Sequence, residues 1–154
     1  MNELYINDKN AYETWHVYMD SSSLSALLTP PPAKDYIIEE ALLEDGERVL
    51  DDRNQGNILF DARDVQIPLC MSAQNEATFF TRYNSFVSEL KTGFLNIRIK
   101  YLTSTGYAWM QFKCIYRSCP QFTQFRRQMA KIMLRVRECN PTDRSYVPAN
   151  NSNA

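Results

Sequence analysis

From residue 64 onward, four segments alternate apolar and polar residues with a period of two. Because successive side chains of a strand point to opposite faces, this pattern predicts strands with one buried face over residues 64–71, 94–101, 107–118 and 126–138. Such half-buried strands are typical of antiparallel sheets. Pro68 lacks a backbone donor and predicts an edge position or a bulge. The alternating positions are Val65, Ile67, Leu69, Met71; Leu95, Ile97, Ile99, Tyr101; Ala108, Met110, Phe112, Cys114, Tyr116; and Ala130, Ile132, Leu134, Val136.

Residues 72–93 carry a helical pattern instead. The apolar residues recur at intervals of three and four, which places them on one stripe of a helix. Asn75 or Ser72 can cap the start of this helix, and Gly93 can end it. We therefore predict one amphipathic helix between the first and second alternating segments. Its apolar stripe is Phe79, Phe80, Tyr83, Phe86, Val87 and Leu90.

The first half of the chain has weaker signals. Residues 4–7 and 15–20 read as short strands. Prolines 30–32 predict that residues 21–35 form a long extended loop, neither helix nor central strand. Beyond it, Asp45 and Gly46 could close a hairpin, although residues 40–44 fit a helical turn equally well. The whole plan is α+β: an antiparallel β sandwich or half-barrel with one helix, a single domain over residues 1–140, and a polar, flexible tail over 141–154.

Composition argues against several functional classes. The chain has 154 residues, 44% of them apolar, enough for one core. We expect no secretory signal and no membrane span, because the N-terminus has no basic and apolar leader and no stretch approaches about 18 apolar residues. The four cysteines form no CxxC pair and the only histidine is His16. We therefore expect no metal site, and free thiols in a reducing cytoplasm.

Residues suited to catalysis are few. His16 is the only imidazole, and the serines of residues 21–25 lack the glycines of a nucleophile elbow. Adjacent acids at 39–40, 44–45 and 51–52 are more typical of a solvated surface than of a glycosidase. Four glycines in the whole chain cannot form a phosphate-binding loop. We predict a protein that is not an enzyme and needs no cofactor.

Charge is divided unevenly along the chain. Residues 1–64 hold 14 acidic and 5 basic side chains, and residues 65–154 hold 4 acidic and 12 basic, so the halves carry −9 and +8. Three interpretations remain open. The halves can neutralise each other within one fold, or the acidic part of one subunit can face the basic part of the next. Alternatively, basic residues of the last strand can bind nucleic acid, with Trp109 and Tyr107 stacking on bases.

Four short segments, in this order, resemble the N-terminal domain of phage distal tail proteins and, more widely, the tail-tube fold. They are Leu-x-Ile-Asn at 4–7, Arg-Asp-Val-x-Ile-Pro at 63–68, Asn-Glu-x-x-Phe-Phe at 75–80 with a later Leu90, and a closing strand with Lys131, Leu134, Arg137 and Pro141. The family commonly has Gly where this chain has Asp8, and many members carry a second domain. No second domain follows here within the 154 residues.

The resemblance implies a non-enzymatic structural protein of a phage-type tail or baseplate. It would form a hexameric ring, contact other tail or baseplate proteins, meet DNA only as channel cargo, and be assembled in the bacterial cytoplasm into the virion tail. Opposed charges and edge strands suit head-to-tail contacts that close by rotation. We predict that the 23–35 loop and the basic last strand form the subunit interface. Its residues are Leu24, Leu27, Leu28, Pro30, Pro31, Arg126, Arg127, Lys131, Arg135 and Arg137.

Overall fold

A computed structural model describes residues 2–34 and 59–148, and the backbone of residues 38–40 and 47–49. An eight-stranded sheet has the order β2-β1-β7-β8-β9-β6-β3, with β10 also paired to β8, and every pairing is antiparallel. Its strands are β1 Glu3–Ile6, β2 Lys9–Asn10, β3 Val17–Met19, β6 Arg63–Ser72, β7 Phe94–Thr103, β8 Gly106–Arg126, β9 Met129–Glu138 and β10 Arg144–Val147. The described helices are α1 Ala11–Trp15, α2 Ser23–Leu28 and α3 Glu76–Leu90.

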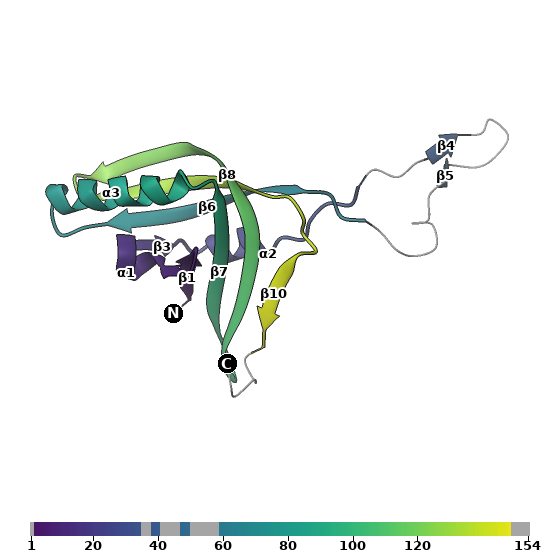
Figure 1. Ribbon diagram of the computed structural model, residues 1–154, viewed down its shortest axis with the longest axis horizontal. Coiled ribbons are helices and arrows are strands. Elements are labelled where there is room, and N and C mark those ends of the chain that lie inside the picture. The colour runs from purple at the N-terminus through teal and green to yellow at the C-terminus, as the bar shows by residue number, and fades with distance from the viewer. Residues whose placement is uncertain (1, 35–37, 41–46, 50–58, 149–154) are drawn as a thin grey trace.

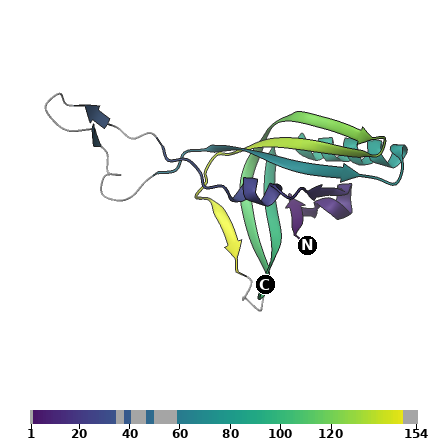
Figure 2. The same ribbon diagram turned by 180° about the vertical axis from the view of Figure 1, so that it is seen from behind.

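The sheet is curled. β1 and β3 stand near opposite ends of the strand order, yet they contact each other and α1 packs on both. β7 and the first part of β8 turn away from β6 and β9, and α3 runs beside the latter pair (Figures 1 and 2). The prediction of an α+β fold built on an antiparallel half-barrel is therefore confirmed.

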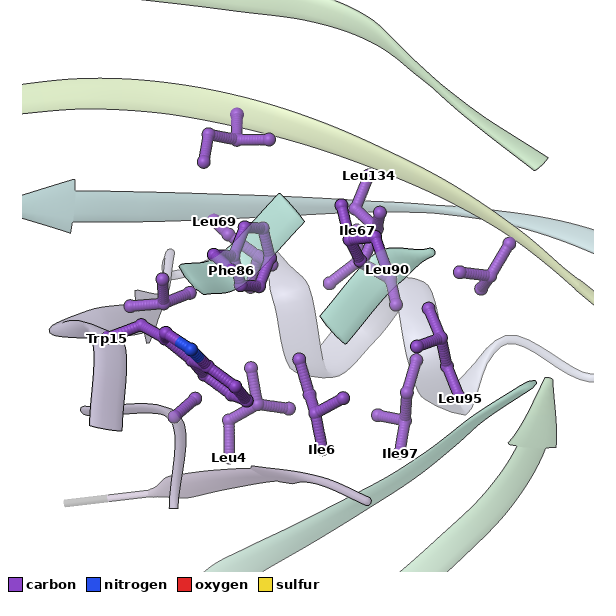
Figure 3. Close-up of a cluster of buried hydrophobic side chains, with 14 of the residues drawn as sticks. Leu4, Ile6, Trp15, Ile67, Leu69, Phe86, Leu90, Leu95, Ile97 and Leu134 are labelled. Atoms are coloured by element: carbon purple, nitrogen blue, oxygen red, sulfur yellow. The ribbon is translucent and has the colours of Figure 1, made fainter. Parts of the chain in front are cut away.

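The core fills the concave side of this sheet. Trp15, Phe86 and Leu90 from the helices meet Ile6, Ile67 and other strand residues in one cluster (Figure 3). The four alternating segments supply its walls, as predicted: in β6 and β9, for example, the residues facing the core are buried and those between them are not. Trp15 also donates from Nε1 to the hydroxyl of Ser85 at 3.1 Å, which ties α1 to α3.

Helix α3 confirms the predicted amphipathic helix, with one correction. Asn75 caps it, accepting from the backbone N–H of Thr78 at 2.8 Å, and Gly93 follows its end with φ of +83°, a value that favours glycine. Phe79, Phe86 and Leu90 are buried. Phe80, predicted to face the core, is 53% exposed, because it lies at the border of the stripe.

Strand β8 is longer than the alternation predicts. It continues through Arg126, and a turn at Arg127 and Gln128 leads into β9. The prediction of one basic last strand over 126–138 is therefore wrong in part: Arg126 ends β8 and Arg127 lies in the turn. The pairing of β8 with β9 shifts register between Ser118 and Gln121, so Pro120 lies at a bulge, where its missing donor is tolerated.

Residues 23–28 form helix α2, contrary to the predicted loop. The prolines begin only at residue 30, so they do not prevent the helix. Tertiary contacts hold it: Leu27 is fully buried, and the Ser23 hydroxyl donates to the carbonyl of Pro68 in β6. β4 Ile38–Glu40 pairs with β5 Glu47–Val49, which bears out the hairpin; the turn at Asp45 and Gly46 lies outside the described residues.

The C-terminal segment departs from the predicted flexible tail. Residues 144–147 form β10, which pairs with β8 over Trp109–Phe112. The described sheet therefore ends at Val147 rather than near residue 140. Arg144 explains the order of this polar segment, because its guanidinium reaches the buried Glu138 of β9. Residues 149–154, the remainder of the predicted tail, lie outside the described residues.

Candidate assembly surfaces

A buried charge cluster joins four elements at one end of the sheet. Arg63 of β6 donates from Nε to Glu138 of β9 at 2.6 Å, and Arg144 of β10 donates to both oxygens of Glu138 at 2.7 and 2.9 Å. Arg63 also donates to the carbonyls of Leu27 and Thr29 at the end of α2. Glu138 is fully buried and Arg63 is 6% exposed. Such charges are tolerated in a core only when paired and hydrogen-bonded.

Electrostatics keep this cluster ionised. Burial by itself would raise the pKa of Glu138, but hydrogen bonds from Arg144 and Arg63 outweigh it, so the pKa lies below the ordinary value. Both guanidinium groups lie near the Phe112 ring, whose centroid is 5.6 Å from the guanidinium carbon of Arg63 and 4.9 Å from that of Arg144. Both carboxylate oxygens of Glu138 accept from an arginine, and we call Arg63, Glu138 and Arg144 the Glu138 clamp.

The Glu138 clamp lies where the chain leaves the body between α2 and β6, and we call this connecting part of the chain the arm. Beyond Thr29, the two chain segments that enter and leave the arm are bonded together: Lys34 N–H donates to Leu59 O at 2.7 Å, and Asp61 N–H to Pro32 O at 2.8 Å. The β4–β5 hairpin lies farther out, apart from the sheet in both views (Figures 1 and 2). An anchored base with an outlying hairpin is a geometry suited to contacting another molecule.

Part of the predicted loop interface is buried in the core. Leu27 is fully buried and Leu24 packs partly against the core, so Leu27 is corrected to a core residue. Leu28 is 42% exposed, Pro30 is exposed and Pro31 is partly exposed. Leu28, Pro30 and Pro31 are therefore accessible to a partner, and so is the part of Leu24 that is not buried.

Exposed loop residues and part of the basic strand lie on either side of β6. A groove of about 510 Å³ runs between residues 26–32 and β6, and Pro30 and Asp64 both line it. Asp64 in turn accepts from Arg137 at 3.3 Å and lies 3.6 Å from Arg135. The structure therefore brings Pro30, Arg135 and Arg137 to one region, bridged by Asp64.

The other predicted basic residues lie elsewhere. Arg126 and Arg127 are at the opposite end of β9, about 30 Å away by the rise of a ten-residue strand. Lys131 is exposed near that end. The predicted basic interface is therefore two separate patches, because the residues fall at both ends of a long hairpin.

The second half of β8 is a surface that the sequence did not single out. β7 pairs with β8 only as far as Ile115, after which Tyr116 N–H donates to Gly93 O at 2.9 Å. From Arg117 to Arg126, β9 covers one edge, and no strand among the described residues covers the edge toward β7. We call this the free β8 edge; Phe122 and Phe125 on it are 42% and 49% exposed.

An apolar groove lies beside the free β8 edge. It has a volume of about 270 Å³ between α3 and the second half of β8. The Tyr83 and Phe122 rings meet edge to face across it, with centroids 5.5 Å apart. Its lining is mostly carbon: Tyr83, Phe86, Val87, Leu90, Lys91, Tyr116, Cys119, Phe122 and Ile132. An apolar groove next to unpaired backbone can accept side chains from an added strand.

Aromatic rings and cations alternate on the convex face of β1, β7 and β8. The Arg98 guanidinium carbon lies 5.2 Å from the Tyr5 centroid and 4.9 Å from that of Trp109. Lys100 Nζ lies 5.2 Å from the same Trp109 ring and 4.5 Å from that of Tyr107. Trp109 and Tyr107, which the nucleic-acid interpretation assigns to stacking on bases, therefore contact cations of β7.

Acidic residues of the first half pair with these cations. Arg98 lies 3.2 Å from a carboxylate oxygen of Asp8, and Lys100 lies 3.7 Å from Glu3. With Asp64 on Arg135 and Arg137, three acids of the N-terminal half thus neutralise basic residues of the C-terminal half. Internal neutralisation therefore accounts for part of the charge division.

The former catalytic candidates have structural roles. His16 ends α1 with φ of +51° and stacks on Tyr12 with centroids 4.8 Å apart. Burial, with a smaller effect of Arg82, lowers the pKa of His16. The Ser23 hydroxyl donates to Pro68 O rather than to an imidazole. Neither side chain is arranged as a nucleophile with its base.

The described residues offer neither a metal site nor a helix that could cross a membrane. In residues 2–34 and 59–148, no group of three or more His, Cys, Asp or Glu side chains is placed to hold a metal ion. No helix in the described part of the chain has the length and apolar character to cross a membrane. A scan against protein-family models and a search of curated proteins find no match. The function is therefore inferred from the chain's own residues and their geometry.

Proposed function

We propose that this protein is a structural subunit that assembles head to tail into a ring, as part of a phage-type tail or baseplate. The observation that carries the proposal is the free β8 edge with its adjacent apolar groove. Unpaired edges are sites where another chain adds, and small domains otherwise cover or blunt them. A partner that covers this edge also buries Phe122 and Phe125, whose exposure in water is unfavourable.

The resemblance to distal tail and tail-tube proteins supports the same proposal. Its four segments fall on β1, β6, α3 and β9, the elements that enclose the core. Asp8, where that family commonly has Gly, has φ of +67°, a backbone region that glycine adopts without strain. The local geometry thus accommodates the family's residue. We extend the proposal to a hexameric ring that contacts other tail proteins in the virion and assembles in the bacterial cytoplasm.

Light scattering after size exclusion tests the proposal directly. Over a rising concentration series, we expect the mass to increase from the 18.0 kDa monomer to one defined multiple, with rings in negative-stain electron micrographs. Closed symmetry requires such a single end point, whereas non-closing contacts give a continuous distribution. A mass that stays at the monomer at millimolar concentration overturns the proposal.

Nucleic-acid binding is the second candidate, favoured by the row of Arg98 and Lys100 among Tyr5, Trp109 and Tyr107. The cations already occupy ring faces in this row, which leaves less aromatic surface for bases. Titration of single-stranded DNA at several salt concentrations separates the two candidates, because contacts to several phosphates force affinity to fall steeply with salt. Binding with such a slope, lost in Trp109→Ala, would favour the second candidate.

A further inference from the structure

The outlying β4–β5 hairpin and the free β8 edge both have backbone groups without a partner among the described strands, and they carry opposite charges. A two-stranded hairpin alone in water is marginally stable. Among the described strands, β4 and β5 pair only with each other. Their register sets Glu40 directly opposite Glu47, and like charges in that position destabilise a hairpin. The hairpin therefore gains stability from a cationic partner that adds backbone hydrogen bonds.

The free β8 edge offers that partner. Arg117 and Arg126 lie on the strand itself, and Lys91 lines the adjacent groove. None of the three has an ion pair with any residue in the described parts of the chain. Basic residues and Pro120 on an edge oppose indiscriminate strand pairing. They leave the edge selective for an acidic strand.

Charge in the sequence matches this selectivity. Residues 35–52 contain eight acidic side chains and one basic one, Arg48. Apolar residues are interspersed with the acids, Ile38 in β4 and Val49 in β5 among them. An acidic strand with apolar positions fits both parts of this surface. Its carboxylates can pair with Arg117 and Arg126, and its apolar side chains can enter the groove beside Phe122.

The hairpin does not lie on the free β8 edge of its own chain, because β4 and β5 form a separate two-stranded sheet. The arm leaves the body beside Arg63, which pairs with Glu138 at the end of β9 far from the β8–β9 turn. The hairpin and that turn lie at opposite ends of the molecule in both views (Figures 1 and 2). The free β8 edge is therefore left for the hairpin of another copy.

We propose that the β4–β5 hairpin of one copy adds to the free β8 edge of the next copy, with apolar side chains in the groove between α3 and β8. This inference rests on the proposed ring, of which it specifies the contact. The donor and acceptor surfaces differ, so the contact is heterologous and repeats around the assembly until rotation closes it.

A charge exchange tests this contact in the full chain. One variant carries Arg117→Glu and Arg126→Glu on the edge, and a second carries Glu40→Lys and Glu47→Lys on the hairpin. Each alone sets like charges against each other at every contact. Because like-charge juxtaposition costs several kcal/mol, we expect the half-assembly concentration of each to rise about tenfold or more. Mixed in equal amounts, the two variants should assemble again, since each hairpin then meets an edge of opposite charge.

Controls separate failure of the contact from failure of the ring. Lys113→Glu changes an exposed charge in the first half of β8, which β7 already pairs and which lies outside the free β8 edge, and should leave assembly unchanged. Circular dichroism and urea unfolding confirm that each variant folds. If the wild type assembles and both charge variants assemble equally well, the contact is wrong while the ring stands. If only the edge variant fails, another occupant covers the edge, and the assignment of the hairpin is overturned. A wild type that never assembles overturns both.

Discussion

The two halves of β8 differ although they belong to one continuous strand. The first half, Gly106 to Ile115, pairs with β7 on one edge and with β10 or β9 on the other. Phe112 in this half is fully buried. Of the strands that the structure describes, only β9 pairs with the second half, Arg117 to Arg126, and Phe122 there is 42% exposed. One strand thus supplies both a stabilising element and a surface with unfilled pairing capacity.

This difference indicates where assembly can be altered without unfolding the chain. In the first half of β8, side chains and backbone groups already contact neighbouring strands, so a substitution there leaves a cavity or an unpaired polar group. In the second half, the edge toward β7 is free to pair with another molecule. A substitution there should therefore change association more than folding. The predictions below test whether stability and assembly separate in this way along β8.

Phe112→Ala should have the largest effect on stability. The ring is fully buried beside two guanidinium groups, and large-to-small changes at such positions cost about 3–5 kcal/mol. Phe122→Ala, the matched change in the second half, should cost less than about 1 kcal/mol. Urea unfolding monitored by circular dichroism measures both. Equal losses for the two variants would mean that the halves do not differ in packing.

Glu138→Gln should rank next. Neutralising this side chain leaves Arg63 and Arg144 without their shared anion in a buried site, which costs about 3 kcal/mol when a buried pair is broken. Glu76→Gln is the control, because Glu76 forms only an exposed pair with Arg127 at 3.7 Å, and such pairs contribute about 0–1 kcal/mol. Indistinguishable urea midpoints for the two variants would contradict a structural role for the Glu138 clamp.

Acid should weaken the same clamp. The folded pKa of Glu138 lies below its unfolded value, so its contribution is present above about pH 4.5 and is lost as pH falls through the folded pKa. The pKa of Glu89 is lowered by hydrogen bonds from Lys9 and Asn7, so its contribution to stability is also lost as pH falls. We expect unfolding free energy to fall less steeply below pH 4.5 in Glu138→Gln than in the wild type. Parallel profiles would exclude Glu138 as a source of the acid sensitivity.

Much of the fold was predictable because burial and alternation coincide. The period of two identified β6, β7, β9 and the first half of β8, and the three-four spacing identified α3. Helix α2 and strand β10 escaped prediction for a common reason. Each is short, and each is held by tertiary bonds, from Ser23 to Pro68 and from Arg144 to Glu138, rather than by a local pattern.

The sequence carries a signal for the Glu138 clamp in the alternation of β6 and β9. Glu138 continues the buried series 130, 132, 134, 136 by one more step of two, and Arg63 precedes the series 65, 67, 69, 71 by the same step. Opposite charges on the core-facing side of two strands predict a buried ion pair. Nothing comparable reveals the free β8 edge, because strand exposure depends on where β7 stops pairing.

Cysteine labelling compares the two halves of β8 without altering packing. Burial raises the pKa of Cys114, in the first half, to about 12, and also raises that of the half-buried Cys119 in the second half. Since the thiolate is the reactive form, a thiol of pKa about 12 reacts on the order of 10³-fold more slowly at pH 8 than one near 8.5.

With iodoacetamide at pH 8 and peptide mass spectrometry, we therefore expect the exposed Cys139 to label first, Cys119 next, and Cys114 only as the chain unfolds. In concentrated urea the cysteines should label at similar rates, which controls for intrinsic reactivity. In the assembled state Cys119 should become slower, because a strand in the groove beside Phe122 covers it, while Cys139 should not change through that contact. Labelling of Cys114 as fast as Cys119 in the native monomer would show that the first half of β8 opens as readily as the second, and the distinction between a packed half and an available half would not hold.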